Sequence, residues 1–341
     1  MSRKHQHGQH FLLKAEARTL SLAQIFRLSD QAAFDLFKEA RWPETDGDPI
    51  CPRCGCVEHY WIGSRKQWRC KGCKHTFSVT SGTLFAHHKM PLRVYIAAIA
   101  LYTNTAKGFS ALQLSRDLDV QYKTAFVLMH KMRESLIDTK GDEMLEGEVE
   151  IDGCYVGNYI RPENKKEDRK DRRLTENQNP NKRCIITIRE RSAHGEGASK
   201  TKIFVVKSEN QANLKALAQA NIKSDAIVHA DEATGYDALH ALYEMKRVNH
   251  QLHYMGENGE CTNQAESYFS RFRRMHKGQV HKMSSQHLHA YANECAYRED
   301  TRRWSNGEIF ADITRRCSKK PTSRNWCGYW QGNRTTERLA T

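Results

Sequence analysis

Four cysteines in two close pairs restrict the fold of this chain more than any other feature of its sequence. Each pair has the pattern C-x2-C, and 15 residues separate the two pairs. Such knuckles hold structural zinc in small antiparallel domains called zinc ribbons, because two thiolates from each complete a tetrahedral site. We therefore expect a zinc ribbon over residues 46–85. The predicted zinc ligands are Cys51, Cys54, Cys70 and Cys73. Cys56 leaves the ligand set at the first knuckle open, since it forms a C-x-C with the preceding cysteine.

A strong positive charge points to a polyanionic partner. The 341 residues carry a formal net charge of +14. An excess of this size is typical of proteins that bind nucleic acid, although a basic surface without such a partner has the same composition. No run of 18 apolar residues is present, and the polar N-terminus does not resemble a signal peptide. We expect a cytoplasmic protein without a membrane partner, in which the eleven cysteines are metal ligands and free thiols rather than disulfides.

Helical patterns flank the cysteine pairs on both sides. Residues 1–45 contain a basic tail followed by a helix that Ser29 caps. Residues 86–140 contain further helices, two of which (110–118 and 121–133) are joined by a short break and resemble a helix-turn-helix. The second helix of such a motif contacts DNA with its first residues, whereas a plain helical hairpin has no such role. The candidate DNA contacts are Gln121, Tyr122, Lys123 and Thr124.

The stretch GEVEIDGCYVG at residues 147–157 predicts a β-strand with one acidic face. Glu148, Glu150 and Asp152 alternate with β-branched residues, and successive side chains of a strand point to opposite faces. The three carboxylates therefore share a face, which is either a solvated edge or part of a site that binds cations. We interpret Asp152 as a metal ligand, and Glu148 and Glu150 as flanking charge.

The segments that follow predict a mixed sheet flanked by helices over residues 141–304. A charged segment, 158–182, reads as a long loop. Lys277 and Gly278 are expected to end the helix that precedes them, and no structure is assigned to the basic tail, 305–341. The expected strands are 183–189, 201–207, 225–231 and 247–253, and the expected helices are 211–222, 263–274 and 284–298.

Two further acids are placed to form a catalytic site with Asp152. Asp231 ends a short apolar strand, and a charge at the C-terminal end of a core strand points into the crevice in which sheet proteins bind ligands. Glu266 begins a helix that carries Arg273 on the same face. Three such carboxylates can hold two Mg²⁺ or Mn²⁺ ions, which activate the attacking oxygen and stabilise the leaving oxygen in phosphodiester chemistry. The basic residues expected to bind phosphates along this helix are Arg271, Arg274 and Lys277.

In their order and separation these motifs resemble the ISXO2-like group of the IS1595 family of DDE transposases. The resemblance covers roughly residues 20–304. It is carried by the cysteine pairs, by EIDGCYVG at 150–157, by HADEATGYDAL at 229–239 and by the segment 263–300.

The resemblance implies an RNase H-like fold and metal-dependent cleavage and strand transfer of transposon DNA ends. Some members of the family use an asparagine as third ligand, so Asn263 is an alternative to Glu266. His281 also matches the family pattern, and is either close to the active site or a packed structural residue. The active-site residues that the resemblance implies are Asp152, Asp231, Glu266 and Arg273.

We therefore interpret the chain as a DNA transposase that binds the inverted repeats of an insertion sequence through its zinc ribbon and helix-turn-helix. Double-stranded DNA, as transposon ends and as target, is the expected partner, and the family leads us to expect a homo-oligomer on DNA. A nuclease of the same fold without joining activity is one alternative. A DNA-binding regulator derived from a transposase is the other, and the presence of all three acids counts against it.

Overall fold

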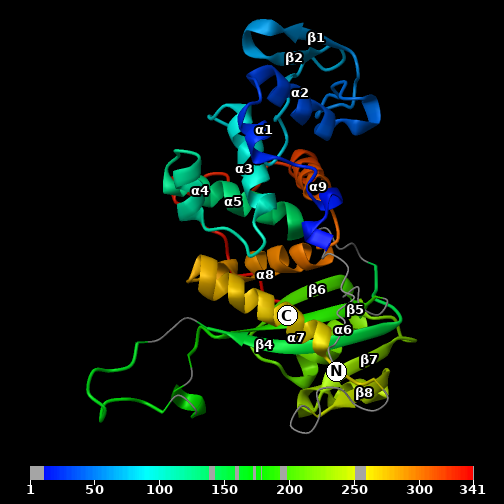
Figure 1. The fold of residues 1–341 in the computed structure, drawn as a ribbon, viewed down its shortest axis with the longest axis vertical. Coiled ribbons are helices and arrows are strands. Elements are labelled where there is room, and N and C mark those ends of the chain that lie inside the picture. Colours follow the sequence, from blue (N-terminus) through cyan, green and yellow to red (C-terminus); the bar gives the residue numbers. More distant parts are fainter. Residues whose placement is uncertain are drawn as a thin grey trace, which may run out of the picture. The chain divides into compact units, whose positions relative to one another are not determined.

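The computed structural model describes residues 11–137, 143–157, 161–171, 174–177, 179–192, 198–249 and 259–340 (Figure 1). The chain forms two compact units. The first, here called the ribbon unit, consists of Met1–Leu136 with Thr301–Arg334. The second, the sheet unit, consists of Ile137–Asp300 with Thr335–Thr341. The ribbon unit is therefore discontinuous in sequence, because most of the sheet unit is inserted into it.

Helices and a small antiparallel sheet of order β1-β2-β3 make up the ribbon unit. Trp68 on β2 is buried in the small sheet and stacks on Phe34 of α2, with ring centroids 5.6 Å apart. The helices of this unit are α1 (Leu22–Phe26), α2 (Asp30–Arg41), α3 (Leu92–Asn104), α4 (Ala111–Asp117), α5 (Tyr122–Ile137) and α9 (Asn306–Lys319). The strands are β1 (His59–Ile62), β2 (Gln67–Cys70) and β3 (Thr76–Ser78).

Local capping explains where two of these helices begin. α2 begins where the sequence predicts, because Oγ of Ser29 accepts a 3.1 Å hydrogen bond from the backbone N–H of Ala32. α9 lies in the tail to which the sequence analysis assigned no structure. Ser305 and Glu308 form a capping box at its start, and α9 packs against α2 and α3. Part of the basic tail therefore contributes to the core of the ribbon unit.

The sheet unit contains a mixed sheet of five strands, as the sequence predicts, in the order β6-β5-β4-β7-β8. β4, β5 and β6 are antiparallel neighbours, whereas β7 runs parallel to both β4 and β8. The strands are β4 (Glu148–Val156), β5 (Arg183–Arg191), β6 (Ala198–Val206), β7 (Ile227–Asp231) and β8 (Glu244–Val248).

Helices cover both faces of this sheet. α6 (Gln211–Asn221) and the 3-10 helix η6 (Thr234–Ala241) pack against the face that carries Val149 and Ile151. α7 (Asn263–Met275) and α8 (Ser285–Asp300) pack against the other face, with buried residues of both helices in one apolar cluster. This mixed α/β fold is confirmed, while its finer assignment as RNase H-like stays a prediction.

The structure corrects two expected boundaries. The last strand is β8, Glu244–Val248, rather than 247–253, and residues 250–253 of that prediction lie outside the described residues. Lys277 and Gly278 do not end the helix that contains Glu266, because α7 continues into a π-helical turn, His276–Val280. The helical path ends at His281, whose φ angle is +60°.

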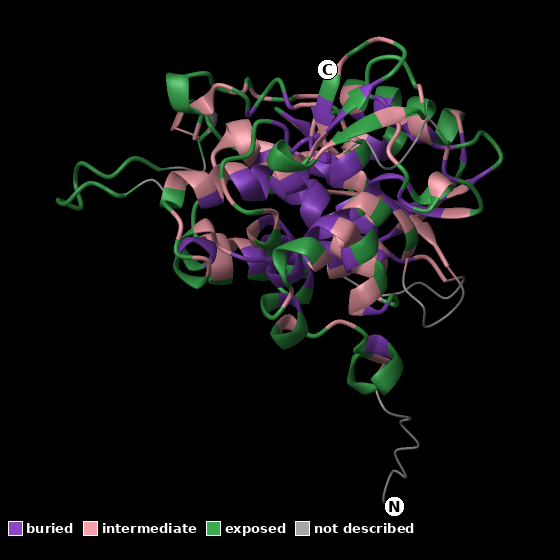
Figure 2. Cartoon of the chain, turned by 90° about the horizontal axis from the view of Figure 1, so that it is seen from above, coloured by how far each residue is buried: buried purple, intermediate pink, exposed green. Residues whose placement is uncertain are grey.

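The remaining segments are short turns and loops. Residues 161–171 of the expected charged loop are exposed throughout (Figure 2). In the described part of the chain, every helix is too short or too polar to cross a bilayer. Short 3-10 turns occupy Phe11–Leu13, Ala15–Ala17, Pro43–Thr45, Gly63–Arg65, Thr175–Asn177 and Tyr329–Gln331.

Candidate functional site

The four predicted zinc ligands lie together in the ribbon. The Sγ atoms of Cys51 and Cys73 are 3.7 Å apart, and those of Cys54 and Cys70 are 3.5 Å apart. All four sulfur atoms lie within 4.8 Å of one another. Tetrahedral thiolates at zinc–sulfur distances of about 2.3 Å would be about 3.8 Å apart, so the group fits a structural zinc ion. Cys56 lies outside the group, with its thiol directed to the carbonyl oxygen of Glu58, which resolves the ambiguity at the first knuckle.

One of these thiols is favoured as a thiolate by the backbone. The N–H of Cys73 donates to Sγ of Cys70 at 3.5 Å, and this hydrogen bond lowers the pKa of Cys70 to about 6. A thiolate is the form that binds zinc, so the turn of the second knuckle favours the ionised state of this one ligand.

Asp152 and Asp231 are neighbours on adjacent strands of the sheet unit. β4 and β7 are parallel, with Glu150 opposite His229. The same register, continued by two residues, places Asp152 opposite Asp231 at the end of β7. Opposite residues of paired strands project from the same face, so the sheet itself brings two of the predicted acids together.

Negative charge accumulates around Asp152. Burial, and then the charges of Asp231, Glu209 and Glu266, raise the pKa of Asp152 to about 8. The backbone N–H of Gly153 opposes this rise by donating a 2.7 Å hydrogen bond to Oδ1 of Asp152. The charges of the other two predicted acids, Asp231 and Glu266, therefore act on Asp152. Glu209, which was not predicted, acts on it as well. Among the described residues these acids are less tightly grouped than the four cysteine sulfurs.

Glu150 joins the strand of Asp152 to the helix of Glu266. Its side chain is fully buried, and its Oε2 atom accepts hydrogen bonds from the backbone N–H groups of Gln264 (2.7 Å) and Ala265 (2.9 Å). Both N–H groups belong to the first turn of α7, where a negative charge is stabilising. Glu150 lies two residues before Asp152, and Ala265 lies one residue before Glu266. This contact therefore fixes the start of α7 against β4.

Arg191 on β5 compensates the acidic face of β4. Its Nε atom donates to Oε1 of Glu150 at 2.8 Å, and its Nη1 atom donates to Oε2 of Glu148 at 2.6 Å. Burial nevertheless raises the pKa of Glu150. Glu148 and Glu150 are thus flanking charges, as interpreted from the sequence, but Glu150 also has a structural role in capping α7 that the sequence did not reveal.

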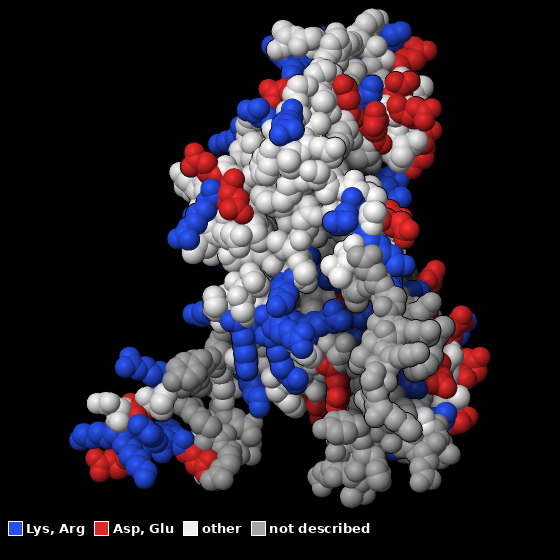
Figure 3. All heavy atoms as spheres, viewed as in Figure 1, with Lys and Arg blue, Asp and Glu red and all other residues white. Residues whose placement is uncertain are grey.

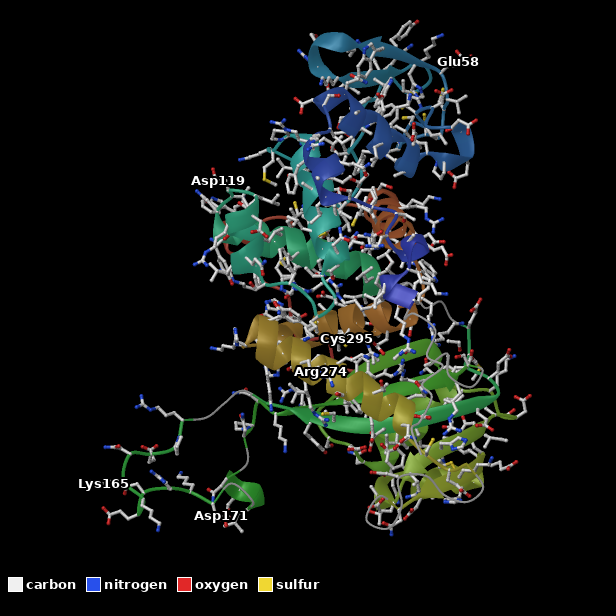
Figure 4. The ribbon with its side chains drawn as sticks, viewed as in Figure 1. Glu58, Asp119, Lys165, Asp171, Arg274 and Cys295 are labelled. Carbon is white, nitrogen blue, oxygen red and sulfur yellow. The ribbon has the colours of Figure 1, made fainter. Side chains whose placement is uncertain are left out.

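The predicted basic residues of α7 differ in their contacts. The Nη2 atom of Arg273 lies 3.3 Å from Sγ of Cys154, two residues beyond Asp152 on β4. Arg271 forms a 2.9 Å ion pair with the buried Glu299 of α8, so part of its charge is used within the fold. Arg274, labelled in Figure 4, and Lys277 are exposed. Figure 3 shows Lys and Arg side chains gathered over α7 and α8, with acidic side chains beside them.

Glu209, between β6 and α6, is an acid of this site that sequence reasoning missed. The hydroxyl of the buried Tyr236 donates a 2.5 Å hydrogen bond to its Oε1 atom. A Cβ atom at Gly153 would overlap the carboxylate of Glu209, so glycine is needed there for space rather than for an unusual backbone angle. Burial, and then Asp231, raise the pKa of Glu209 despite its bond to Tyr236. A glycine within a strand often marks a place where another group approaches the backbone closely. Gly153 was therefore the feature of the sequence that could have indicated an approaching side chain such as that of Glu209.

The structure shows where two further predicted residues, Asn263 and His281, lie. Asn263 is the exposed first residue of α7. His281 is exposed after the π-helical turn, and its backbone N–H donates to the carbonyl oxygen of His276 at 2.7 Å. The alternative of a packed, buried His281 is therefore wrong, while its proximity to the active site stays a prediction.

The predicted DNA contacts lie at the start of α5. Four residues join α4 to α5, and Asp119 (labelled in Figure 4) turns the chain with a φ angle of +50°. Gln121 and Tyr122 are exposed, whereas Lys123 and Thr124 are partly buried. The helix pair is present as expected, and its role in DNA recognition stays a prediction.

Two segments of this chain match the sequence models of known protein domains. Residues 144–300 match the sequence model of the ISXO2-like transposase domain of the IS1595 family. Residues 28–76 match that of a transposase zinc-ribbon domain. A protein of Halobacterium salinarum, described as an uncharacterized protein in transposable element ISH50, is 25% identical over 277 residues, which cover 77% of this chain and 90% of the relative. The two matched segments contain the acids around Asp152 and the four clustered cysteines.

Removal of zinc is expected to unfold the ribbon, because close thiolates repel one another without a cation. Metal analysis should find about one zinc ion per chain, and a chelator should abolish the slow hydrogen exchange of β2 amides. Cys70→Ser should lose the metal, whereas the matched variant Cys56→Ser should keep it. Zinc retained in Cys70→Ser would remove Cys70 from the ligand set.

Replacement of the helix-capping acid, Glu150→Gln, is expected to lower the free energy of unfolding by about 1–3 kcal/mol, because the buried neutral amide removes one of the two carboxylates that pair with Arg191. Urea unfolding measures the change, and hydrogen exchange of the Gln264 and Ala265 amides should accelerate. The control is Glu148→Gln, whose more exposed side chain should cost less than about 1 kcal/mol. Equal costs for the two variants would contradict a special role for Glu150.

Gly153→Ala is expected to displace the carboxylate of Glu209 and thereby break its hydrogen bond with Tyr236. Tyr236→Phe removes the same bond from the other side. The two losses of stability should therefore be non-additive, with a coupling of about 0.5–3 kcal/mol in a double-mutant cycle. Strict additivity would show that Gly153 and Tyr236 do not act through the same carboxylate.

Proposed function

We propose that this chain, which belongs to the IS1595 family of transposases, binds the terminal inverted repeats of an insertion sequence, cleaves the 3′ ends of the element and joins them to target DNA. The observation that carries the proposal is the accumulation of acids around Asp152, next to the basic helix α7 of the same unit. The basic side chains of α7 hold the polyanionic DNA. The acids supply ligands for the metal ions that phosphodiester chemistry requires.

The acids fit divalent metal ions of the Mg²⁺ or Mn²⁺ type. Carboxylate oxygens are hard ligands that select these ions over zinc. Burial, and then the negative charges of the neighbouring acids, raise the pKa of Asp152, and a cation would offset those charges. We assign Asp152, Asp231 and Glu266 as the ligands. When bound, two such ions lower the pKa of a water molecule and stabilise charge on the leaving oxygen.

The side chains of the sheet unit position the substrate around these acids. Arg273 approaches β4 at Cys154, so a phosphate held by its guanidinium would lie close to Asp152. Arg274 and Lys277 extend the cationic surface along the exposed side of the helix. Arg271, which is already paired with Glu299, supports the helix and makes a weaker contribution to DNA binding.

The reaction has two steps that use the same acids. In the first, water attacks the phosphodiester at the transposon end and frees a 3′-hydroxyl group. In the second, that hydroxyl attacks a phosphodiester of the target, and the target's own 3′-oxygen departs. No covalent link to a serine or tyrosine forms, so the chain contributes positioning and electrostatic stabilisation rather than a nucleophile.

Recognition of the element's ends is assigned to the ribbon unit. The basic zinc ribbon and the start of α5, from Gln121 to Thr124, are the proposed contacts with the inverted repeats. Because two ends must be processed together, at least two copies of the chain are expected on one DNA complex, in the cytoplasm and associated with the nucleoid.

The proposal is tested by a strand-transfer assay with the inverted repeats that flank the gene and a target plasmid. Each of Asp152→Asn, Asp231→Asn and Glu266→Gln should lower the rate of cleavage and of joining by about two to three orders of magnitude, because each removes a ligand of the metal ions. Activity should require Mg²⁺ or Mn²⁺. A variant that keeps full activity would remove its residue from the site.

The matched control is Asp225→Asn, an exposed acid just before β7, which should leave both rates unchanged. Cleavage without joined products would favour a nuclease. Tight binding to the inverted repeats without any metal-dependent reaction would favour a regulator.

A further inference from the structure

A cavity of about 460 Å³ lies beside the start of α5 in the ribbon unit. One wall is the first turns of α5, and another is the segment 326–330, which follows α9 in sequence. The cavity shares Gln121, Lys123 and Thr124 with the proposed contacts to the inverted repeats, whereas the segment 326–330 has no role in the function proposed above. Its volume is within the range of sites that hold a small ligand or a single residue of a polymer.

The segment that closes the cavity is anchored by aromatic contacts. Trp326 is buried, and its ring stacks on that of His130 of α5 at 4.5 Å between centroids. Tyr329 lies against Phe126 of the same helix, with centroids 6.0 Å apart. The wall is thus a defined part of the fold rather than a loose tail.

A flat aromatic surface remains available next to this anchor. The side chain of Trp330 is 70% exposed although the residue lines the cavity. The Nζ atom of Lys123 lies 4.5 Å from the centroid of the Trp330 ring, a cation–π distance. The ammonium group of Lys123 therefore contacts the indole of Trp330. The exposed ring remains available for a planar group to stack on it.

The charge of the cavity has one sign. Lys89, Lys123 and Lys131 line it, and none of the described lining residues is Asp or Glu. Lys89 is exposed, whereas Lys131 is partly buried. Burial lowers the pKa of Lys131, and the charge of Glu134 opposes this shift. The lining therefore suits an anionic occupant.

We propose that this cavity binds an unpaired nucleotide of DNA, with its base stacked on Trp330 and its phosphate beside Lys131 and Lys89. Stacking platforms combined with cations are the usual means of binding single-stranded nucleic acid without regard to sequence. A duplex keeps its bases inside the helix, so the site is selective for a single-stranded end or a displaced base. The inference rests on the DNA-binding function proposed above, and adds that the ribbon unit recognises single-stranded as well as duplex DNA.

The test compares two fluorescein-labelled probes by anisotropy with the full-length protein: a hexamer of thymidylate and a blunt random-sequence duplex of about 20 base pairs. Trp330→Ala should weaken binding of the hexamer, relative to the duplex, by about 5- to 150-fold, the loss expected for one stacked base. Trp330→Tyr, which keeps a ring, should retain most of that preference. Lys131→Met should weaken hexamer binding and make it less dependent on salt.

The controls are Trp304→Ala and Lys107→Met, two exposed residues of the same unit that lie outside the cavity, and neither should change the ratio of the two affinities. A hexamer of glutamate supplies charge without bases, and binding as tight as that of the DNA hexamer would overturn the inference. So would an unchanged ratio in Trp330→Ala while the wild-type protein binds duplex. If the wild-type protein binds neither DNA probe, the proposed DNA-binding function itself fails.

Discussion

The contact between Glu150 and the first turn of α7 is the interaction on which the arrangement of the acids depends. Parallel pairing of β4 with β7 ends at Glu150 and His229, two residues before Asp152 and Asp231, and so brings these two acids near each other. Glu266 is different, because it lies on a helix whose rotation and height above the sheet are not set by strand pairing. A carboxylate that accepts two N–H groups at the helix start fixes both. Its burial is costly, and Arg191 together with those N–H groups offsets the cost.

The cysteine cluster and the acids around Asp152 differ in the type of their side chains and in their surroundings. The ribbon places four soft thiolates within one tetrahedron, where a zinc ion contributes directly to folding. The sheet unit instead gathers hard carboxylates, spreads them more widely and leaves a basic helix beside them. The first arrangement is closed and structural, whereas the second has the mutual repulsion and access that a reacting phosphate needs.

Sequence patterns predicted those elements whose signal is local. The alternation in β4 and the Ser29 cap identified their elements, and cysteine spacing identified the zinc ligands. β8 was misplaced because EMKRV has no alternation of apolar and polar residues. Glu209 was missed because a single acid after a strand has no pattern, and its position depends on space left by Gly153 far away in sequence. The capping box at Ser305 and Glu308 was a readable signal for α9 that the basic composition of the tail obscured.

The discontinuity of the ribbon unit has a consequence for dissecting this protein. α9 follows Ile137–Asp300, the larger part of the sheet unit, yet it packs against α2 and α3. A fragment that stops after α5 would expose the surface of α2 and α3 that α9 covers. Exposed apolar surfaces of this kind promote self-association. A fragment that contains the ribbon unit alone must therefore be made by excising residues 137–300 and reconnecting the two flanks with a linker, rather than by truncating the gene.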